Sequence, residues 1–181
     1  MEITLEKPRG YFDWIRMYVL YLNAFPPSER KPFGIIRSMY NGGRTDVWRI
    51  LRDGKFAGFA STVNGRDLIL LDYLAIAKAQ RSRGVGSGAM SALMARYSGL
   101  GLFVEIETTK KDSHDRMIRE KRRRFYENAG MIDLGVSARI FGVEMDLLGV
   151  GCALTFGEYQ NFYRDYYSPR AAQHLEPLFE E

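Results

Sequence analysis

The stretch "YLAIAKAQRSRGVGSGAMSALMARY", residues 73–97, decides the fold. An apolar run ends at Ala77, a basic and polar segment follows it, and glycines then alternate at Gly84, Gly86 and Gly88. A helix N-terminus presents unpaired N–H groups and the positive end of the helix dipole, and glycines let a phosphate reach that backbone. Apolar residues then recur at helical spacing: Val85, Ala89, Leu93 and Tyr97. The stretch therefore predicts a strand, a phosphate-binding turn and a helix.

Arginines in the turn add positive charge for phosphate oxygens. The expected ligand is a pyrophosphate, bound at the glycines with the help of Arg81 and Arg83. The alternative is a glycine-rich connection that only joins the strand to the helix.

The same glycines also fit a dinucleotide-binding fingerprint, G-x-G-x-x-G/A after a strand with an acidic residue about 20 positions on. Gly84, Gly86 and Ala89 satisfy it, and Glu105 lies near the required distance. In that fingerprint, however, the glycines follow their strand directly within a parallel βαβ unit. Here a basic segment intervenes and hairpins come first, which disfavours the dinucleotide interpretation. A Walker loop is excluded because no Gly-Lys-Ser/Thr follows.

The residues before the turn, 45–77, predict a three-stranded antiparallel meander. The runs "TDVWRILR", "KFAGFASTV" and "RDLILLDYLAIA" are separated by Asp53-Gly54 and Asn64-Gly65. Both dipeptides favour two-residue hairpin turns, because their residues accept a positive φ. The third run is apolar on both faces, which predicts a strand in the middle of a sheet.

Helical patterns dominate the N-terminal part. Residues 3–6 predict a short strand, residues 11–25 a helix, and a second helix ends near Tyr40. The expected buried face of the first helix consists of apolar residues three and four positions apart: Phe12, Ile15, Val19 and Leu22.

After the glycine helix, "LFVEIE" predicts a strand, and residues 112 to about 129 a very basic helix closed by Gly130. Residues 131–157 contain two further candidate strands. We expect one domain over residues 1–181, with 158–181 as a C-terminal helical and aromatic extension. The predicted fold class is α/β: a mixed sheet flanked by helices, antiparallel in the meander and parallel where the glycine helix crosses over.

The composition limits the possible partners. The net charge of +4 suits an anionic ligand but is too weak to indicate nucleic acid. A single cysteine, Cys152, and two histidines far apart in sequence give no support to a disulfide or a metal site. No signal pattern and no uncharged apolar run of about 18 residues is present, so we expect a cytoplasmic protein without a membrane partner.

Two motifs resemble one known family. "RSRGVG", residues 81–86, after the strand "DYLAI", looks like the acetyl-CoA motif R/Q-x-x-G-x-G/A of the GCN5-related N-acetyltransferases (GNAT). "RRRFYENAGM", residues 122–131, is similar to the second motif of that family, a helix that ends in a Leu/Phe-Tyr-x-x-x-Gly-Phe/Met signature. The order of the two motifs, with hairpins before and one strand between, is also that of the family.

The resemblance implies the acyl-CoA N-acyltransferase fold, in which the parallel central strands splay apart. The pantetheine arm of acetyl-CoA would lie in the gap and contact the backbone of Leu74, Ala75 and Ile76. A backbone N–H there would hold the thioester oxygen as charge develops on it. The pyrophosphate of coenzyme A would be held by the turn residues Arg81, Ser82, Arg83, Gly84, Val85, Gly86, Ser87 and Gly88.

The reaction that the resemblance implies is direct attack of an amine on the thioester, with Tyr126 as the acid that serves the leaving sulfur. A phenol with a pKa of about 10 and a thiol of about 8.5 make that step uphill by about 2 kcal/mol. Glu105 is the favoured base, and Glu107 and Asp72 stay open. The structural alternatives are a core aromatic for Tyr126 and salt bridges for the three carboxylates.

The sequence also departs from the family. Arg119 and Arg122 stand where many members carry Asn and Ala. The acceptor, a small-molecule or peptide amine, should be selected by the N-terminal helices and the loop "FPPSERKPFG". Whether the protein forms a homodimer is left open by the sequence. Two other functions also stay open: an acyl-CoA-binding or sensor protein without catalysis, and an NAD(P)-binding domain.

Overall fold

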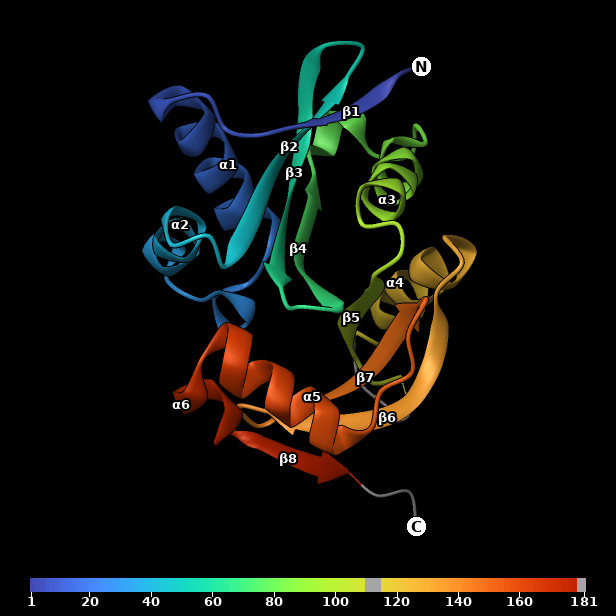
Figure 1. Ribbon diagram of the computed structural model, residues 1–181. Helices are drawn as coiled ribbons and strands as arrows, with labels where there is room; N and C mark the ends of the chain where they lie inside the picture. Colours follow the sequence, from blue (N-terminus) through green and yellow to red (C-terminus); the bar gives the residue numbers. More distant parts are fainter. Residues whose placement is uncertain (110–114, 179–181) are drawn as a thin grey trace. The chain divides into compact units, whose positions relative to one another are not determined.

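The computed structural model describes residues 1–109 and 115–178 (Figure 1). Their elements, in chain order, are β1 (Ile3–Glu6), α1 (Tyr11–Ala24), η1 (Pro27–Glu29), α2 (Phe33–Asn41), β2 (Thr45–Arg52), β3 (Lys55–Asn64), β4 (Leu68–Ile76), η2 (Lys78–Gln80), α3 (Val85–Arg96), β5 (Gly101–Glu107), α4 (Arg116–Asn128), β6 (Ile132–Ile140), β7 (Val143–Val150), α5 (Phe156–Phe162), η3 (Tyr163–Tyr167), α6 (Pro169–Ala172) and β8 (Leu175–Leu178).

Within the described residues, the strands form one eight-stranded mixed sheet in the order β1-β2-β3-β4-β5-β7-β6-β8. β1 pairs with β2, and β2 with β3, in antiparallel fashion. β4 and β5 are parallel, with a register from Leu68–Gly101 to Leu70–Phe103, and β4 continues to Ile76. β5, β7, β6 and β8 then pair antiparallel. The predicted fold class, a mixed sheet with an antiparallel meander followed by parallel strands, is confirmed.

The chain has two compact units that share β4. Unit 1 comprises residues 1–64 and 71–98, and unit 2 comprises residues 65–70 and 99–181. The predicted phosphate turn therefore belongs to unit 1. Tyr126 and Glu105 belong to unit 2.

In unit 1, α1 and α2 cover one side of the strands, and α3 lies on the other side (Figure 1). Met17, Tyr21 and Ile36 of the two helices form a core with strand residues on that side: Val47, Phe59, Tyr73 and Ala75. The four apolar residues whose spacing predicts this helix, Val85, Ala89, Leu93 and Tyr97, are all buried.

The predicted buried face of α1 is wrong. Phe12 is 77% and Val19 51% exposed, and Ile15 and Leu22 are exposed as well. The helix carries a second stripe with the same spacing, which packs inward instead: Trp14, Met17, Tyr21 and Ala24. Spacing cannot separate two apolar stripes on one helix. The inward stripe contains Tyr21, whose buried hydroxyl contacts the carbonyl oxygen of Lys31 at 2.8 Å and the hydroxyl of Tyr73 at 3.2 Å.

The two predicted hairpin turns have different outcomes. Asp53 and Gly54 both have positive φ, 49° and 74°, as a two-residue turn requires. Asn64-Gly65 is not such a turn, because β3 ends at Asn64 and β4 begins only at Leu68. A Cβ at Gly65 would lie 2.8 Å from the carbonyl oxygen of Leu68, so close packing requires this glycine.

In unit 2, Phe103 of β5 packs edge-on against Tyr159 and Phe162 of α5. The basic helix α4 begins at Arg116 in the described part of the chain; its predicted start at residue 112 lies outside the described residues. Gly130, with a φ of 96°, follows the helix as predicted. β8 has no counterpart among the predicted elements, because "LEPL" is short and contains a proline, which sheets tolerate at edge strands.

Gly58 of β3 should not tolerate a side chain. A Cβ at this position would lie 2.3 Å from the carbonyl oxygen of Ala75 on β4, and a backbone atom cannot move aside. We expect Gly58→Ala to lower the free energy of unfolding by about 3 kcal/mol, measured by urea denaturation. Gly34→Ala in α2 is the matched control: its Cβ meets nothing within 4 Å, so its stability should stay unchanged or rise. Equal stabilities of the two variants would contradict the close approach.

Candidate active site

The predicted phosphate turn connects β4 to α3. Gly84 precedes the helix in a left-handed conformation, with a φ of 74°, and Ser82 also has a positive φ. The N–H of Gly88 donates a hydrogen bond to the carbonyl oxygen of Gly84 at 2.9 Å. The N–H groups of the first helical turn before Gly88 therefore lack intrahelical acceptors, which is the arrangement that binds anions.

The arginines of the turn are exposed to solvent. Arg81 donates from Nε to the carbonyl oxygen of Ile76 at 3.0 Å, which fixes its guanidinium beside the end of β4. Gly88, in contrast, has a packing role: a Cβ there would lie 2.7 Å from Cγ1 of Ile3 on β1. The turn thus combines exposed cations with helix N–H groups, while its last glycine lets α3 approach the sheet.

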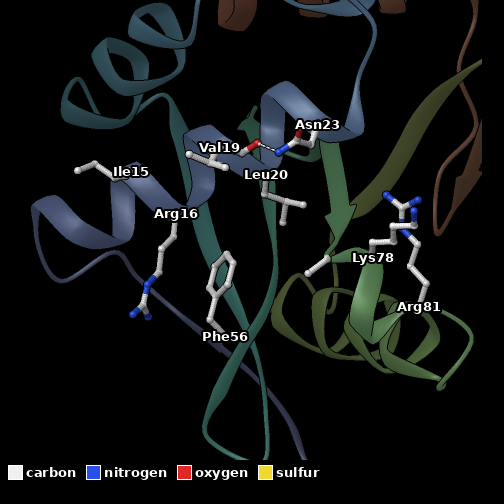
Figure 2. A pocket seen from close by; sticks show the side chains of 9 residues that line it. Ile15, Arg16, Val19, Leu20, Asn23, Phe56, Lys78 and Arg81 are labelled. Carbon is white, nitrogen blue, oxygen red and sulfur yellow. Dashed lines mark hydrogen bonds between the residues drawn. The ribbon is translucent and has the colours of Figure 1, made fainter.

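A cavity of about 630 Å³ adjoins the turn within unit 1 (Figure 2). One wall is formed by α1, including Ile15 and Val19 of its outward stripe, and the facing residues come from β3 and from the segment after β4. The lining residues are Ile15, Arg16, Val19, Leu20, Asn23, Phe56, Ala77, Lys78 and Arg81. This lining is largely apolar and carries cations, so the cavity suits a ligand with an apolar part and a negative charge. Ile15 and Val19, which are exposed on α1, thus line this cavity.

The predicted pantetheine segment, Leu74–Ile76, is the last part of β4. Ala75 is buried, and Leu74 and Ile76 are half-buried. The chain is anchored just beyond it, where Ala77 donates its N–H to the carbonyl oxygen of Ala57 at 2.9 Å.

Asp72, one of the three candidate bases, lies in a buried ion pair. Its carboxylate is 2.5 Å from the ammonium of Lys31, and the two side chains are only 8% and 13% exposed. The neighbouring Tyr73 hydroxyl contacts the backbone of Glu29 and Lys31 as well. Both residues therefore tie the segment between α1 and α2 to β4. The sequence pattern did not indicate that Lys31 is the partner.

Tyr126 is buried near the end of α4, with 8% of its surface exposed. Burial raises the pKa of its phenol to about 12, although the charge of Arg122, one turn earlier, opposes the shift. The phenol stays protonated at neutral pH and can act as a hydrogen-bond donor. Its ring packs edge-on against Phe125 at 5.0 Å.

Glu105 of β5 accepts two hydrogen bonds from the C-terminal aromatic segment. The hydroxyls of Tyr159 and Tyr163 donate to the same oxygen, Oε1, at 2.5 and 2.7 Å. Burial, followed by the charge of Glu105, raises the pKa of both phenols well above the usual value. Sequence reasoning did not connect these residues, although two tyrosines four positions apart in "EYQNFY" share a helix face.

Glu107, the third candidate, forms an ion pair with Arg119 of α4 at 2.7 Å. Arg123, one turn further along, pairs with Asp146 of β7 at 3.1 Å and with Asp133 of β6. Two arginines of the basic run thus bind α4 to its own sheet. Arg119, which departs from the family pattern, has a structural partner.

The sequence model of the Acetyltransferase (GNAT) family matches residues 14–131, well over half of the chain. The chain belongs to this family. The matched range includes the glycine turn and the helix that ends in "FYENAGM", the two motifs on which the resemblance was based.

Solved structures of GNAT proteins are similar in fold. A protein described as a GNAT-family acetyltransferase from Bacteroides thetaiotaomicron has a TM-score of 0.72 at 16% identity, over 92% of this chain and 99% of that one. The ribosomal-protein-S18-alanine N-acetyltransferase of Escherichia coli has a TM-score of 0.63 at 16% identity, over 85% and 96%. A Bacillus subtilis acetyltransferase in complex with CoA has 0.57 at 15%, over 84% and 98%. No curated protein sequence matches the chain significantly.

Over residues 1–109 and 115–178, no helix is long and apolar enough to cross a membrane. The same residues contain no group of three or more His, Cys, Asp or Glu side chains that could hold a metal ion.

The ion pair of Asp72 and Lys31 can be tested by a double-mutant cycle. Asp72→Asn leaves a buried ammonium without this carboxylate and should lower the free energy of unfolding by about 3 kcal/mol. Adding Lys31→Met should restore most of that loss, because no buried charge then remains. Urea denaturation of both single variants and the double variant measures the coupling. Additive losses would contradict the ion pair.

Proposed function

We propose that this GNAT protein transfers the acetyl group of acetyl-CoA to a primary amine by direct attack. The observation that carries the proposal is the turn before α3, where Gly84 in the left-handed conformation, unpaired helix N–H groups and the exposed Arg81 and Arg83 come together. The family match over residues 14–131 supports the same donor.

The residues present fit coenzyme A. The helix N–H groups and the arginines from Arg81 to Gly88 would hold the pyrophosphate. The backbone of Leu74, Ala75 and Ile76 would hydrogen-bond the pantetheine arm as an added strand does. The cavity beside Lys78 and Arg81 supports this assignment, since it offers apolar walls and positive charge next to the turn. When bound, acetyl-CoA supplies the activated thioester.

In this proposal Tyr126 donates a hydrogen bond to the departing sulfur. With a pKa of about 12, against about 8.5 for a thiol, complete proton transfer from the phenol would be uphill by about 5 kcal/mol. A hydrogen bond to the developing thiolate avoids most of that cost. The role of Tyr126 is therefore to stabilise negative charge on sulfur while the phenol keeps its proton.

Glu105 is the proposed base that removes a proton from the acceptor ammonium. Asp72 and Glu107 are each engaged by a cationic side chain, Lys31 and Arg119, within ion-pair distance. Glu105 accepts hydrogen bonds from the hydroxyls of Tyr159 and Tyr163, which orient its carboxylate, and its side chain is partly exposed.

The acceptor is a small-molecule or peptide amine. The E. coli structure described above is named for an alanine of a ribosomal protein, so a peptide amine is within the range of this fold. We propose that α1, α2 and the segment between them select the acceptor, since Asp72 and Tyr73 hold this segment on β4.

Coenzyme A should stabilise the folded protein. At about 100 times its Kd, CoA should raise the Tm by several degrees in a thermal-shift assay. Gly86→Glu should abolish the shift by placing a carboxylate where phosphate binds. Gly10→Glu adds the same charge in open space and should keep the shift. Stabilisation by NAD or NADP but not by CoA would instead support the dinucleotide alternative.

Tyr126→Phe should lower kcat about 100-fold, because the sulfur loses its hydrogen-bond donor, while the KM for acetyl-CoA stays close to the wild-type value. Thiol release from acetyl-CoA across a panel of primary amines measures both quantities. Tyr97→Phe is the control: it removes another buried phenol, which donates to Asp46 at 2.9 Å, and should lower the Tm but not kcat. A change in KM alone would contradict the role of Tyr126. If CoA stabilises the protein but no amine releases thiol, the non-catalytic binding protein is the better description.

A further inference from the structure

The C-terminal aromatic segment places two buried hydroxyls on one carboxylate oxygen. Tyr159 and Tyr163 are 0% and 2% exposed, and their hydroxyls lie 2.5 and 2.7 Å from Oε1 of Glu105. Hydrogen bonds from O–H to a charged carboxylate at these distances are the strong, charge-assisted kind. Because both phenol pKa values are raised, the two hydroxyls keep their protons and act as donors at neutral pH.

The segment is built to hold these hydroxyls in place. A capping box begins α5, with Thr155 and Glu158 bonding reciprocally. Phe103 of β5 packs against Tyr159 and Phe162, which fixes the helix over the strand that carries Glu105. From Tyr163 the helix continues as the π-helix η3, a rare element that is frequently found at functional sites.

We propose that Tyr159 and Tyr163 are positioning residues for Glu105 in acetyl transfer. They fix the orientation of its carboxylate and favour its ionised form, so that it is ready to accept the proton of the acceptor ammonium. This inference rests on the proposed function, in which Glu105 is the base. Neither tyrosine is required to touch the substrate, and the sequence motifs of the family do not include them.

Other groups near Glu105 also influence the pH dependence of the reaction. On β5, Glu107 shares its face and pairs with Arg119 of α4. On β7, the residue opposite Glu105 is the apolar Leu147. From the C-terminal segment, Tyr167 stacks on Tyr163 at 4.6 Å. The two phenol donors are the contacts that single substitutions can remove with little change of shape.

The test is the pH profile of kcat/KM for the full chain, with acetyl-CoA and the best amine of the panel. Loss of one donor makes the ionised carboxylate less favourable, so the acid limb should move to higher pH by about one unit in Tyr159→Phe and in Tyr163→Phe. Tyr166→Phe is the matched control, because it removes a neighbouring hydroxyl of η3 from a ring that packs on Phe162. Its profile should equal that of the wild type.

A second readout does not depend on activity. The ¹³C shift of the Glu105 carboxyl, assigned with Glu105→Gln, should titrate at higher pH in Tyr159→Phe and Tyr163→Phe than in the wild type. An unchanged titration and an unchanged acid limb, with only a lower Tm, would show a merely structural role and overturn the inference.

The outcomes also separate this inference from the proposed function. If the wild type acetylates amines and Glu105→Gln does not, but Tyr159→Phe and Tyr163→Phe keep the wild-type profile, only the inference fails. If Glu105→Gln keeps the wild-type rate, the base assignment fails, and the role of the two tyrosines fails with it. A wild type that acetylates no amine overturns the proposed function itself.

Discussion

Strand direction changes at β4, and the candidate donor site follows from that change. β4 has an antiparallel meander before it and the parallel β5 after it. Parallel neighbours cannot be joined by a tight turn, so the chain must cross over through a helix, here α3. The first turn of that helix then lies just after the carboxyl end of β4, where its unpaired N–H groups are the proposed anion site. The glycines and arginines of residues 81–88 adapt a connection that the topology already requires.

The three candidate bases have similar sequence contexts but different contacts in the structure. All three lie on strands: Asp72 on β4, and Glu105 and Glu107 on β5. Asp72 and Glu107 form ion pairs with Lys31 and Arg119, which come from segments far away in the sequence. Such partners depend on how helices dock, and no spacing rule predicts them. The packing of distant segments, and not sequence spacing, decides which partners each carboxylate contacts.

The sequence predicted correctly those elements that neighbouring residues specify by themselves. Asp53-Gly54 specifies its turn through the positive φ of both residues, and the apolar residues whose spacing predicts α3 are all buried. The prediction of the buried face of α1 was wrong because the helix has two apolar stripes. The stripe that packs inward is the one with Tyr21, whose hydroxyl contacts Lys31 and Tyr73. Gly88 was assigned to phosphate from its place in the motif, whereas its contact with Ile3 gives it a packing role. The Tyr159–Glu105 contact joins residues far apart in the chain, so the local pattern indicates only that Tyr159 and Tyr163 share a helix face.

The two proton tasks of the proposed reaction differ in difficulty. Thiolate is a tolerable leaving group, because a thiol pKa of about 8.5 lies close to neutral, and a hydrogen bond from a phenol with a pKa of about 12 already favours its departure. The acceptor is the harder problem: a primary amine with a pKa of about 10.4 is neutral in only about one molecule of a few thousand at pH 7. Whatever controls the base therefore controls the rate more than whatever controls the acid. This gives a physical reason why two buried phenols, Tyr159 and Tyr163, should orient the proposed base, Glu105 of β5.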